Sequence, residues 1–265
     1  MKNFIFYLFL FIFILLTILG IFANFISPFN PNLNDFSNVN LNSNFTHFFG
    51  TDLFGRDIFS RVIFGLQNSL IIGICAGFLS TFIAILYASF ASLNDKTNVI
   101  LERLIDAFLS IPSILFIMLF SSISTGSIFV ITIIIGFFSW MQSTKVFTQN
   151  FRISLKSNYV LQAKILGANH FELIFMEILP NLKNLILTLF GINITHAITT
   201  EATLSFFGIG CDLNQISLGI ILNESLQALF LGAWKNFFYP CFVLFLLILS
   251  IMILTGSIEK KGIKI

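Results

Sequence analysis

Residues 107–144 decide the fold, and they read AFLSIPSILFIMLFSSISTGSIFVITIIIGFFSWMQST. This stretch holds no Asp, Glu, Lys or Arg over 38 residues, whereas about 20 apolar residues suffice for one helix to cross a bilayer. Near its middle, residues 121–127 (SSISTGS) are the small and polar types that favour turns. The stretch therefore predicts a hairpin of two membrane-spanning helices, with a kink at Pro112 in the first of them.

The composition of the whole chain also indicates a membrane protein. Of 265 residues, 57% are hydrophobic and 10% are charged, whereas soluble domains carry about 25% charged residues. The folded surface must therefore face lipid. A net charge of +2, without any block of Lys or Arg, argues against nucleic acid as a partner. Three cysteines without C-x-x-C spacing argue against a disulfide framework or a thiolate metal site.

Further charge-free runs place the other spans. Residues 4–26 form about 35 Å of helix, too long for the apolar core of a signal peptide, so we expect this helix to be retained. Two prolines and many asparagines within residues 27–49 predict a solvated loop after it. The remaining runs cover residues 66–93, 184–207 and 236–258.

The predicted fold is an all-α membrane protein with about six transmembrane helices. Residues 1–26 are the first transmembrane helix, and 27–65 are an extracytoplasmic loop with a short amphipathic helix. Residues 66–265 are a five-helix core that includes a loop at 150–183 between the fourth and fifth spans. With the N-terminus in the cytoplasm, eleven Lys and Arg residues lie on the cytoplasmic side and three on the other. The positive-inside rule therefore predicts that both termini are cytoplasmic.

The cytoplasmic loop contains a helix-turn-helix pattern at residues 159–181, YVLQAKILGANHFELIFMEILPN. Gly167 suits the left-handed end of a first short helix. Asn169 predicts the cap of a second helix, with Glu172 completing a capping box, and we expect Pro180 to end it. An apolar stripe at helical spacing follows, and it packs either on the chain's own spans or in a groove of a partner. The stripe consists of Phe171, Ile174, Phe175 and Ile178.

This loop resembles the cytoplasmic coupling loop of ABC importer permeases. Gly167 and the run Ile178, Leu179 and Pro180 match that family's pattern, whereas residues 161–163 (LQA) stand where Glu-Ala-Ala is usual. The resemblance implies that the loop docks into an ATPase subunit. The residues that it assigns to this contact are Ala163, Gly167, Ala168, Phe171, Phe175, Ile178 and Pro180.

A second motif lies at residues 47–61, HFFGTDLFGRDIFSR. Thr51 suits the cap of a short helix, and acid-to-base pairs at i, i+4 spacing join Asp52 to Arg56 and Asp57 to Arg61. These features predict either an amphipathic surface helix or a surface that contacts a binding protein or gates the outer mouth. The motif is similar to the signature of the second permease of oligopeptide, dipeptide and nickel importers. The matching residues are Gly50, Thr51, Asp52, Gly55, Arg56, Asp57, Ser60 and Arg61.

Residues 103–113 and 201–210 also resemble this family, so the similarity covers roughly residues 45–257. It implies a multi-pass subunit of the bacterial inner membrane. Its expected partners are a second related permease, two ABC ATPase subunits and an extracytoplasmic solute-binding protein. ATP and Mg²⁺ are expected on the ATPases. The chain has no G-x-x-x-x-G-K-[ST] loop and no evident nucleophile-base pair, so we expect no cofactor and no catalysis of its own.

Three ionisable residues lie at or near membrane depth. Placing the charged side chains of Asp106 and Glu201 there costs free energy. The two residues therefore indicate a hydrogen bond at a helix end or between subunits, or alternatively a role in the translocation pathway. His196 precedes Glu201 by five residues, which separates the two side chains by about 140° around a helix. A transient nickel site at His196 would require a metal cargo. We therefore expect no resident metal site.

The predicted function is a permease that forms half of a pathway for di- or oligopeptides, because no convincing set of metal ligands lines the spans. Nickel import by the same architecture is the alternative within the family. A membrane scaffold that transports nothing fits the span count equally well, but it has no reason to carry a coupling loop. The chain lacks the paired catalytic groups that an intramembrane enzyme would need. A secondary transporter would not need a docking helix pair.

Overall fold

The computed structural model describes residues 2–124, 126–209 and 215–262, and regular structure within them is helical throughout. Five helices are long and apolar enough to cross a membrane, and a sixth span arises when two helices joined by a bend are counted together. The predicted all-α membrane fold is therefore confirmed. The spans are α1 (Lys2–Ile21), α3 (Ile58–Ala91), the pair α4 (Asp95–Leu109) and α5 (Ser113–Ile123), α6 (Ile128–Leu155), α10 (Lys183–Phe206) and α12 (Lys235–Gly262).

The predicted hairpin forms α5 and α6, which are separated by residues 124–127. Next to Pro112 the helix is broken rather than kinked, and the two helices on either side of the break, α4 and α5, are bent by 71° to each other. The cause is local: Pro112 precedes the first residue of α5 with an extended backbone (ψ 124°), a conformation that interrupts the helix. The third span also begins before residue 107, with α4. The charged residues of α4 interrupt the charge-free run, so that run predicted only the later part of this span.

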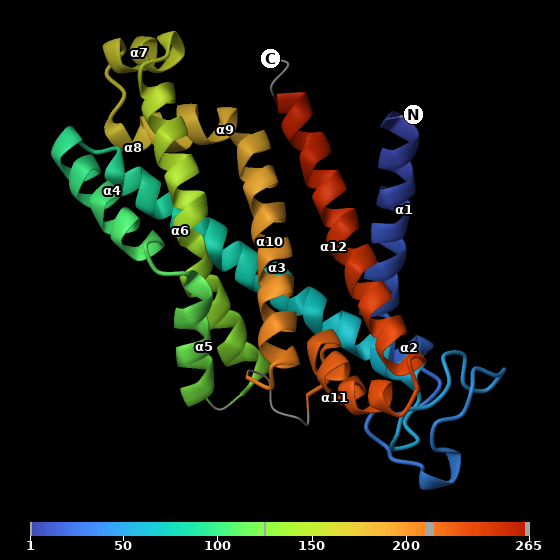
Figure 1. The fold of residues 1–265 in the computed structure, drawn as a ribbon. Coiled ribbons are helices and arrows are strands. Elements are labelled where there is room, and N and C mark those ends of the chain that lie inside the picture. Colours follow the sequence, from blue (N-terminus) through green and yellow to red (C-terminus); the bar gives the residue numbers. More distant parts are fainter. Residues whose placement is uncertain (1, 125, 210–214, 263–265) are drawn as a thin grey trace.

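The spans alternate in direction, so the start of α1 and the end of α12 lie at the same end of the bundle (Figure 1). That end also carries the short helices α7 (Asn158–Ile165) and α8 (His170–Glu172). The opposite end carries α11 (Leu218–Phe230), α2 (Ala23–Ile26) and the loop that follows α2. We call these the α7 end and the α11 end.

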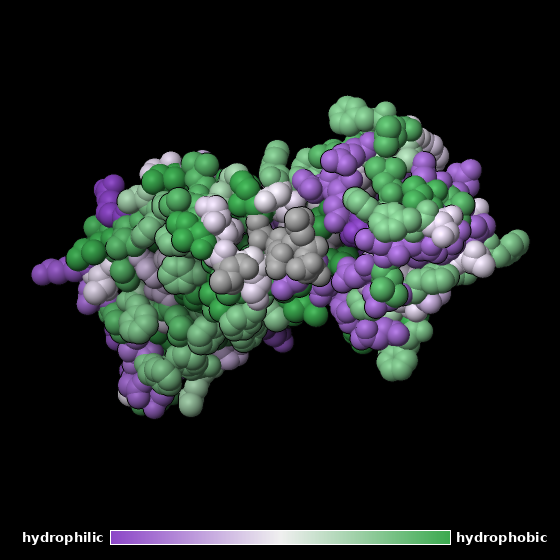
Figure 2. Space-filling model, turned by 90° about the horizontal axis from the view of Figure 1, so that it is seen from below, coloured by the Kyte–Doolittle hydropathy of each residue, from purple (hydrophilic) through white to green (hydrophobic). Residues whose placement is uncertain are grey.

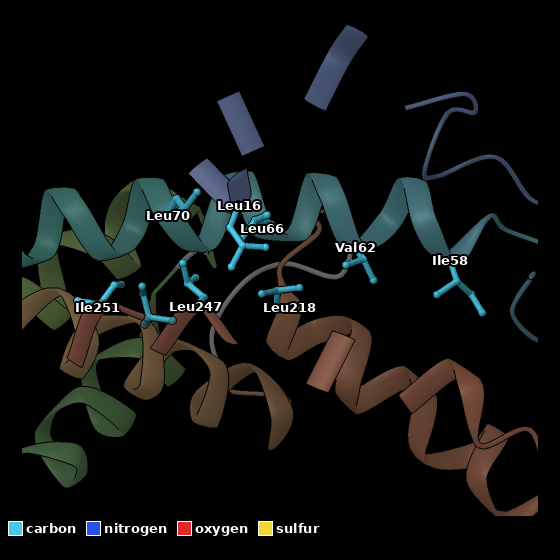
Figure 3. Packing of buried hydrophobic residues seen from close by; sticks show 9 residues of the cluster. Leu16, Ile58, Val62, Leu66, Leu70, Leu218, Leu247 and Ile251 are labelled. Atoms are coloured by element: carbon cyan, nitrogen blue, oxygen red, sulfur yellow. The ribbon is translucent and has the colours of Figure 1, made fainter. Parts of the chain in front are cut away.

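Helix α3 is the central element of the fold. Its 34 residues give about 51 Å of helix, more than the roughly 30 Å of a bilayer core, and it crosses the bundle obliquely in Figure 1. Near the α11 end, its buried face packs against α1, α11 and α12 (Figure 3). Toward the other end, it packs against α6 and α10 through small residues such as Ala76, Ala84 and Ala88. Small residues let membrane helices approach closely without a hydrophobic driving force.

Apolar side chains cover much of the exterior, as expected for a surface in lipid. Phe4 and Phe11 of α1 are exposed, as are Phe242 and Phe245 of α12. Figure 2 shows the molecule from the α11 end, where hydrophilic residues gather on the side of the loop after α2, while the other side is largely hydrophobic. This distribution fits a chain whose flanks face lipid and whose loop faces water.

The loop between α2 and α3 differs from the prediction. Its described regular structure is a single 3-10 turn, η1 (Phe36–Asn38), and the predicted short amphipathic helix is not formed. Thr51 instead pairs with Asp57 in an isolated antiparallel bridge, and α3 begins at Ile58. The boundary between loop and core therefore lies at residue 58, not at 66, because α3, capped by Asp57, begins eight residues before the charge-free run does.

Candidate functional site

The predicted helix-turn-helix is present at the α7 end, and we call residues 158–181 the coupling segment after the loop that they resemble in sequence. Helix α7 ends at Ile165, and Gly167 follows with φ +95°, the left-handed conformation that favours glycine. The Asn169 side chain accepts the backbone N–H of Glu172, whose carboxylate accepts the N–H of Asn169, both within 2.9 Å. The expected capping box is therefore confirmed.

The end of the coupling segment corrects one prediction. Pro180 does not end the second helix, because helical backbone continues past it to Asn181, the last residue of α9 (Leu179–Asn181). Leu182 then separates α9 from α10. Pro180 occupies the first turn of α9, where its missing N–H is tolerated. The six residues before α9, η2 (Leu173–Ile178), are wound as a π-helix, a rare form that is often found at functional sites.

The apolar stripe of the coupling segment divides into two faces. Ile174 and Ile178 are buried against α3, α6 and α10, together with Phe147 and Phe151. Phe171 and Phe175 point away from this core, and their rings lie 4.2 Å apart with 67% and 42% of each side chain exposed. Half of the stripe thus anchors the segment to its own spans, and the other half is left without cover.

Further exposed apolar side chains of the coupling segment lie on α7 and in the glycine turn. Ala163 and Ala168 are half-buried and pack against the core, so the turn itself is supported. An exposed apolar group this large at the tip of a polar loop is typical of a surface that meets a partner. The exposed side chains are Leu161, Ile165, Leu166, Phe171, Phe175 and Met176.

At the α11 end, the signature forms a tight turn that is bonded to the rest of the outer loop. Gly50 and Gly55 have φ near +75°, and a Cβ on either would overlap a backbone carbonyl, of Leu41 and Asp35 respectively. Buried Thr51 accepts the Leu41 N–H and donates to a loop carbonyl. Asn38 and the Ser37 N–H hydrogen bond the Asp35 carboxyl and lower its pKa. Several signature residues therefore serve the turn itself.

Four charged side chains form an ionic cluster beneath this turn: Asp52, Arg56, Arg61 and Glu224. Arg56 binds Asp52 at 2.6 Å, which confirms the first predicted ion pair. Arg61 does not pair with Asp57; it binds Asp52 at 3.2 Å and Glu224 of α11 at 2.7 Å. Arg56 also binds Glu224, at 2.8 Å. Burial raises the pKa of the Glu224 carboxyl, and the guanidinium of Arg56 opposes that rise.

Asp57 has a different role from the one predicted. Its carboxylate accepts the backbone N–H of Ser60 at 2.8 Å and the Ser60 hydroxyl at 2.6 Å, and so caps α3. Its other oxygen lies 2.9 Å from Nδ1 of His47. A carboxylate that caps a helix and binds a histidine is not free for Arg61, which is why the second predicted pair is absent.

Glu224 could have been suspected from the sequence. It is the one charged residue in the largely apolar run 218–230, and an ionisable group in such a helix needs a partner. Its partners lie 163 and 168 residues away, so spacing rules for a single helix could not identify them.

The three ionisable residues predicted at membrane depth do not converge. Glu201 of α10 is fully buried, accepts the Ser205 hydroxyl at 2.8 Å and lies 3.4 Å from the Ser69 hydroxyl of α3. Asp106 pairs with Lys145 at 2.7 Å, and both side chains are about half exposed.

His196 lies 3.3 Å from the Ser139 hydroxyl of α6, so it and Glu201 contact different helices. Among the described residues, no three His, Cys, Asp or Glu side chains form a group suited to hold a metal.

The structure brings together polar residues of α10 that sequence reasoning missed. Asn193 donates to the Thr81 hydroxyl of α3 at 2.9 Å and accepts from the Ser143 hydroxyl of α6 at 2.8 Å, all three being buried. Hydrogen bonds of this kind join helices within a membrane.

A different face of α10 carries Thr195, Thr199 and Thr203, whose hydroxyls each donate to the carbonyl four residues earlier. We call these three residues the hydroxyl stripe. Thr199 is exposed and the other two are partly so, which leaves polar groups uncovered along a helix that spans the bundle.

Comparison with known proteins agrees with this architecture. The family described as binding-protein-dependent transport system inner membrane component matches residues 80–261. The oligopeptide transport system permease protein OppC of Bacillus subtilis (strain 168) is 30% identical over 235 residues, which cover 88% of this chain and 77% of that protein. The dipeptide transport system permease protein DppC of the same strain is 26% identical over 251 residues, covering 94% and 78%.

The matched residues 80–261 include the coupling segment, α10 and Glu224, and they amount to more than half of the chain. The match to OppC extends the similarity to most of the remainder. The chain therefore belongs to the family of binding-protein-dependent transport system inner membrane components.

Proposed function

We propose that the chain is the membrane-spanning permease subunit of an ATP-driven importer and forms half of a pathway for di- and oligopeptides. The observation that carries the proposal is the coupling segment, which anchors one apolar face in the membrane core and leaves another uncovered. Relatives named as oligopeptide and dipeptide transport permeases support peptides as the cargo rather than nickel. A scaffold that transports nothing would need no such segment.

The α7 end faces the cytoplasm in this proposal. That end carries five Lys and Arg residues in α4, in α6 and the residue after it, and in the coupling segment: Lys96, Arg103, Arg152, Lys156 and Lys164. At the α11 end, Arg56 and Arg61 are held in the ionic cluster. This asymmetry follows the positive-inside rule and supports insertion in the bacterial inner membrane.

The coupling segment docks into an ATPase subunit through Phe171, Phe175 and their exposed apolar neighbours. Ile174 and Ile178, on the opposite face, pack against α3, α6 and α10, so movement of the docked segment is passed directly to three spans. ATP and Mg²⁺ bind on the ATPases, and this chain contributes motion rather than catalysis. Alternating access follows when the spans rock around the pathway.

The hydroxyl stripe of α10 is the proposed lining of the pathway. Its three hydroxyls are spaced by one helical turn and carry no charge, which suits passing contacts with peptide groups of varied sequence. One such face makes half a pathway, so a second related permease supplies the other half. A solute-binding protein delivers the cargo at the α11 end, where the signature turn and the ionic cluster give the outer loop a fixed shape.

The experiment is uptake in cells that lack this chain, measured with a labelled dipeptide, a labelled oligopeptide and labelled Ni²⁺, each with and without the restored gene. Loss and rescue of peptide uptake alone is the expected result. Loss and rescue of Ni²⁺ uptake alone would replace peptide by metal as the cargo. If none of the three uptakes changed, the assignment as a peptide importer would be wrong.

A further inference from the structure

A cavity of about 420 Å³ lies at the α7 end, behind the coupling segment. Its walls come from the turn between α3 and α4, the last turns of α6, and α7 with the helix that follows it. These elements lie side by side in Figure 1. Among the described residues of its wall, only Leu161 belongs to the exposed apolar set proposed for docking, so the polar chemistry of the cavity requires a separate explanation.

The cavity is lined by positive charge. Arg152 and Lys164 both line it, and none of the described side chains in its wall is acidic. The recorded ion-pair partner of Arg152 is Glu102, at a long 3.5 Å, with both side chains nearly half exposed. Exposed ion pairs of this kind contribute little to the free energy of unfolding, so the Arg152 guanidinium can leave Glu102 and bind an incoming anion.

Neutral polar groups complete the wall. Asn98 is only 4% exposed, and its Oδ1 has no hydrogen-bond partner in the described structure. This oxygen accepts hydrogen bonds, and leaving it unpaired is costly. A bound group pairs with it only through a donor, such as a hydroxyl of a glycerol head group or the P–OH of inorganic phosphate. Ser92 and His170 lie 3.3 Å apart, Oγ to Nε2, in the same wall.

We propose that this cavity binds a phosphate group, carried by an anionic phospholipid or free in solution. Arginine and lysine together with neutral donors are the groups that bind phosphate oxygens. Leu93 and Leu161 line the same cavity, and each is about half exposed. An apolar rim beside a basic pocket at the end of membrane helices suits a lipid, whose acyl chains would follow the leucines.

Binding there would link the α3–α4 turn to the coupling segment, because residues of both contribute to the wall. A phosphate held by Arg152 of α6 and Lys164 of α7 would tie the coupling segment to a membrane span. The inference does not depend on the cargo, and its test measures binding rather than uptake.

The test uses the full chain purified in detergent. Native mass spectrometry counts bound phosphatidylglycerol against phosphatidylcholine with the same acyl chains, and calorimetry measures inorganic phosphate. Arg152→Gln combined with Lys164→Gln should weaken binding of the preferred anion at least about tenfold, since each charge-assisted hydrogen bond contributes that much or more. Asn98→Asp, a nearly isosteric change that adds a negative charge, should weaken it by a similar factor.

The control combines Lys96→Gln with Lys156→Gln, which removes the same charge from α4 and from the residue that follows α6, at positions that do not line this cavity. It should change the affinity by less than about twofold. The lysine and arginine variants should keep the unfolding midpoint of the parent, because Lys96, Arg152, Lys156 and Lys164 are not buried. Binding of phosphatidylglycerol alone would identify the lipid as the source, and binding of inorganic phosphate would identify a free anion. Equal losses in the control and cavity variants, or no loss in either, would overturn the proposal.

Discussion

Replacing Arg61 by methionine should destabilise the chain strongly. The Arg61 side chain is 3% exposed and binds both Asp52 and Glu224. Removal of one member of a buried ion pair costs about 3–5 kcal/mol, because the remaining charge stays buried without its partner. Arg56 keeps its own bonds to both carboxylates, at 2.6 and 2.8 Å, which places the expected loss near the lower limit, about 3 kcal/mol.

The assay is the thermal unfolding midpoint of the purified chain in detergent. For a chain of this length, about 3 kcal/mol corresponds to a fall of roughly 6–12 °C. Arg103→Met is the matched control, since Arg103 is an exposed arginine of α4 and such substitutions change stability by about 0.5 kcal/mol or less. If Arg61→Met and Arg103→Met had midpoints within 2 °C of each other, roughly the resolution of such a comparison, the ionic cluster would not stabilise the outer loop as argued.

Three further changes test other parts of the structure. In the same unfolding assay, Gly50→Ala should lower stability by more than about 2 kcal/mol, because strain at positive φ adds to the overlap of the new Cβ with backbone atoms. The control Gly232→Ala, at a similar φ in open space, should lower stability by only about 1–2 kcal/mol. Asn193→Leu should lower stability by about 1–2 kcal/mol through loss of two interhelical hydrogen bonds, and an unchanged midpoint would show that they contribute nothing. Changing all three threonines of the hydroxyl stripe to valine should reduce peptide uptake at least about threefold while leaving the midpoint unchanged, and full uptake would exclude the stripe from the pathway.

Much of the fold could be predicted from the sequence because lipid imposes a simple rule on composition. Each span needs a long run without charges, and these runs identified α1, α3, α6, α10 and α12. The capping box of the coupling segment was equally predictable, since the bonds involved join residues three apart.

The features that could not be predicted depend on distant contacts. The ionic cluster joins residues more than 160 positions apart, and no local pattern pairs Arg61 with Glu224. Asp57 has i, i+4 spacing to Arg61, yet its carboxylate caps α3 instead. The division of the apolar stripe into a buried and an uncovered face depends on how the coupling segment lies on the core, which periodicity alone does not reveal.

The most direct test of the account is ATP-driven peptide uptake by the reconstituted importer carrying Phe171→Ala and Phe175→Ala. The control is Phe78→Ala with Phe82→Ala, another exposed pair of neighbouring phenylalanines, which lies on the outer face of α3. The account predicts that the coupling-segment variant loses peptide uptake and no longer retains the ATPase on purification, while the control does both normally. Normal uptake by the coupling-segment variant would contradict the claim that this surface couples the chain to ATP hydrolysis.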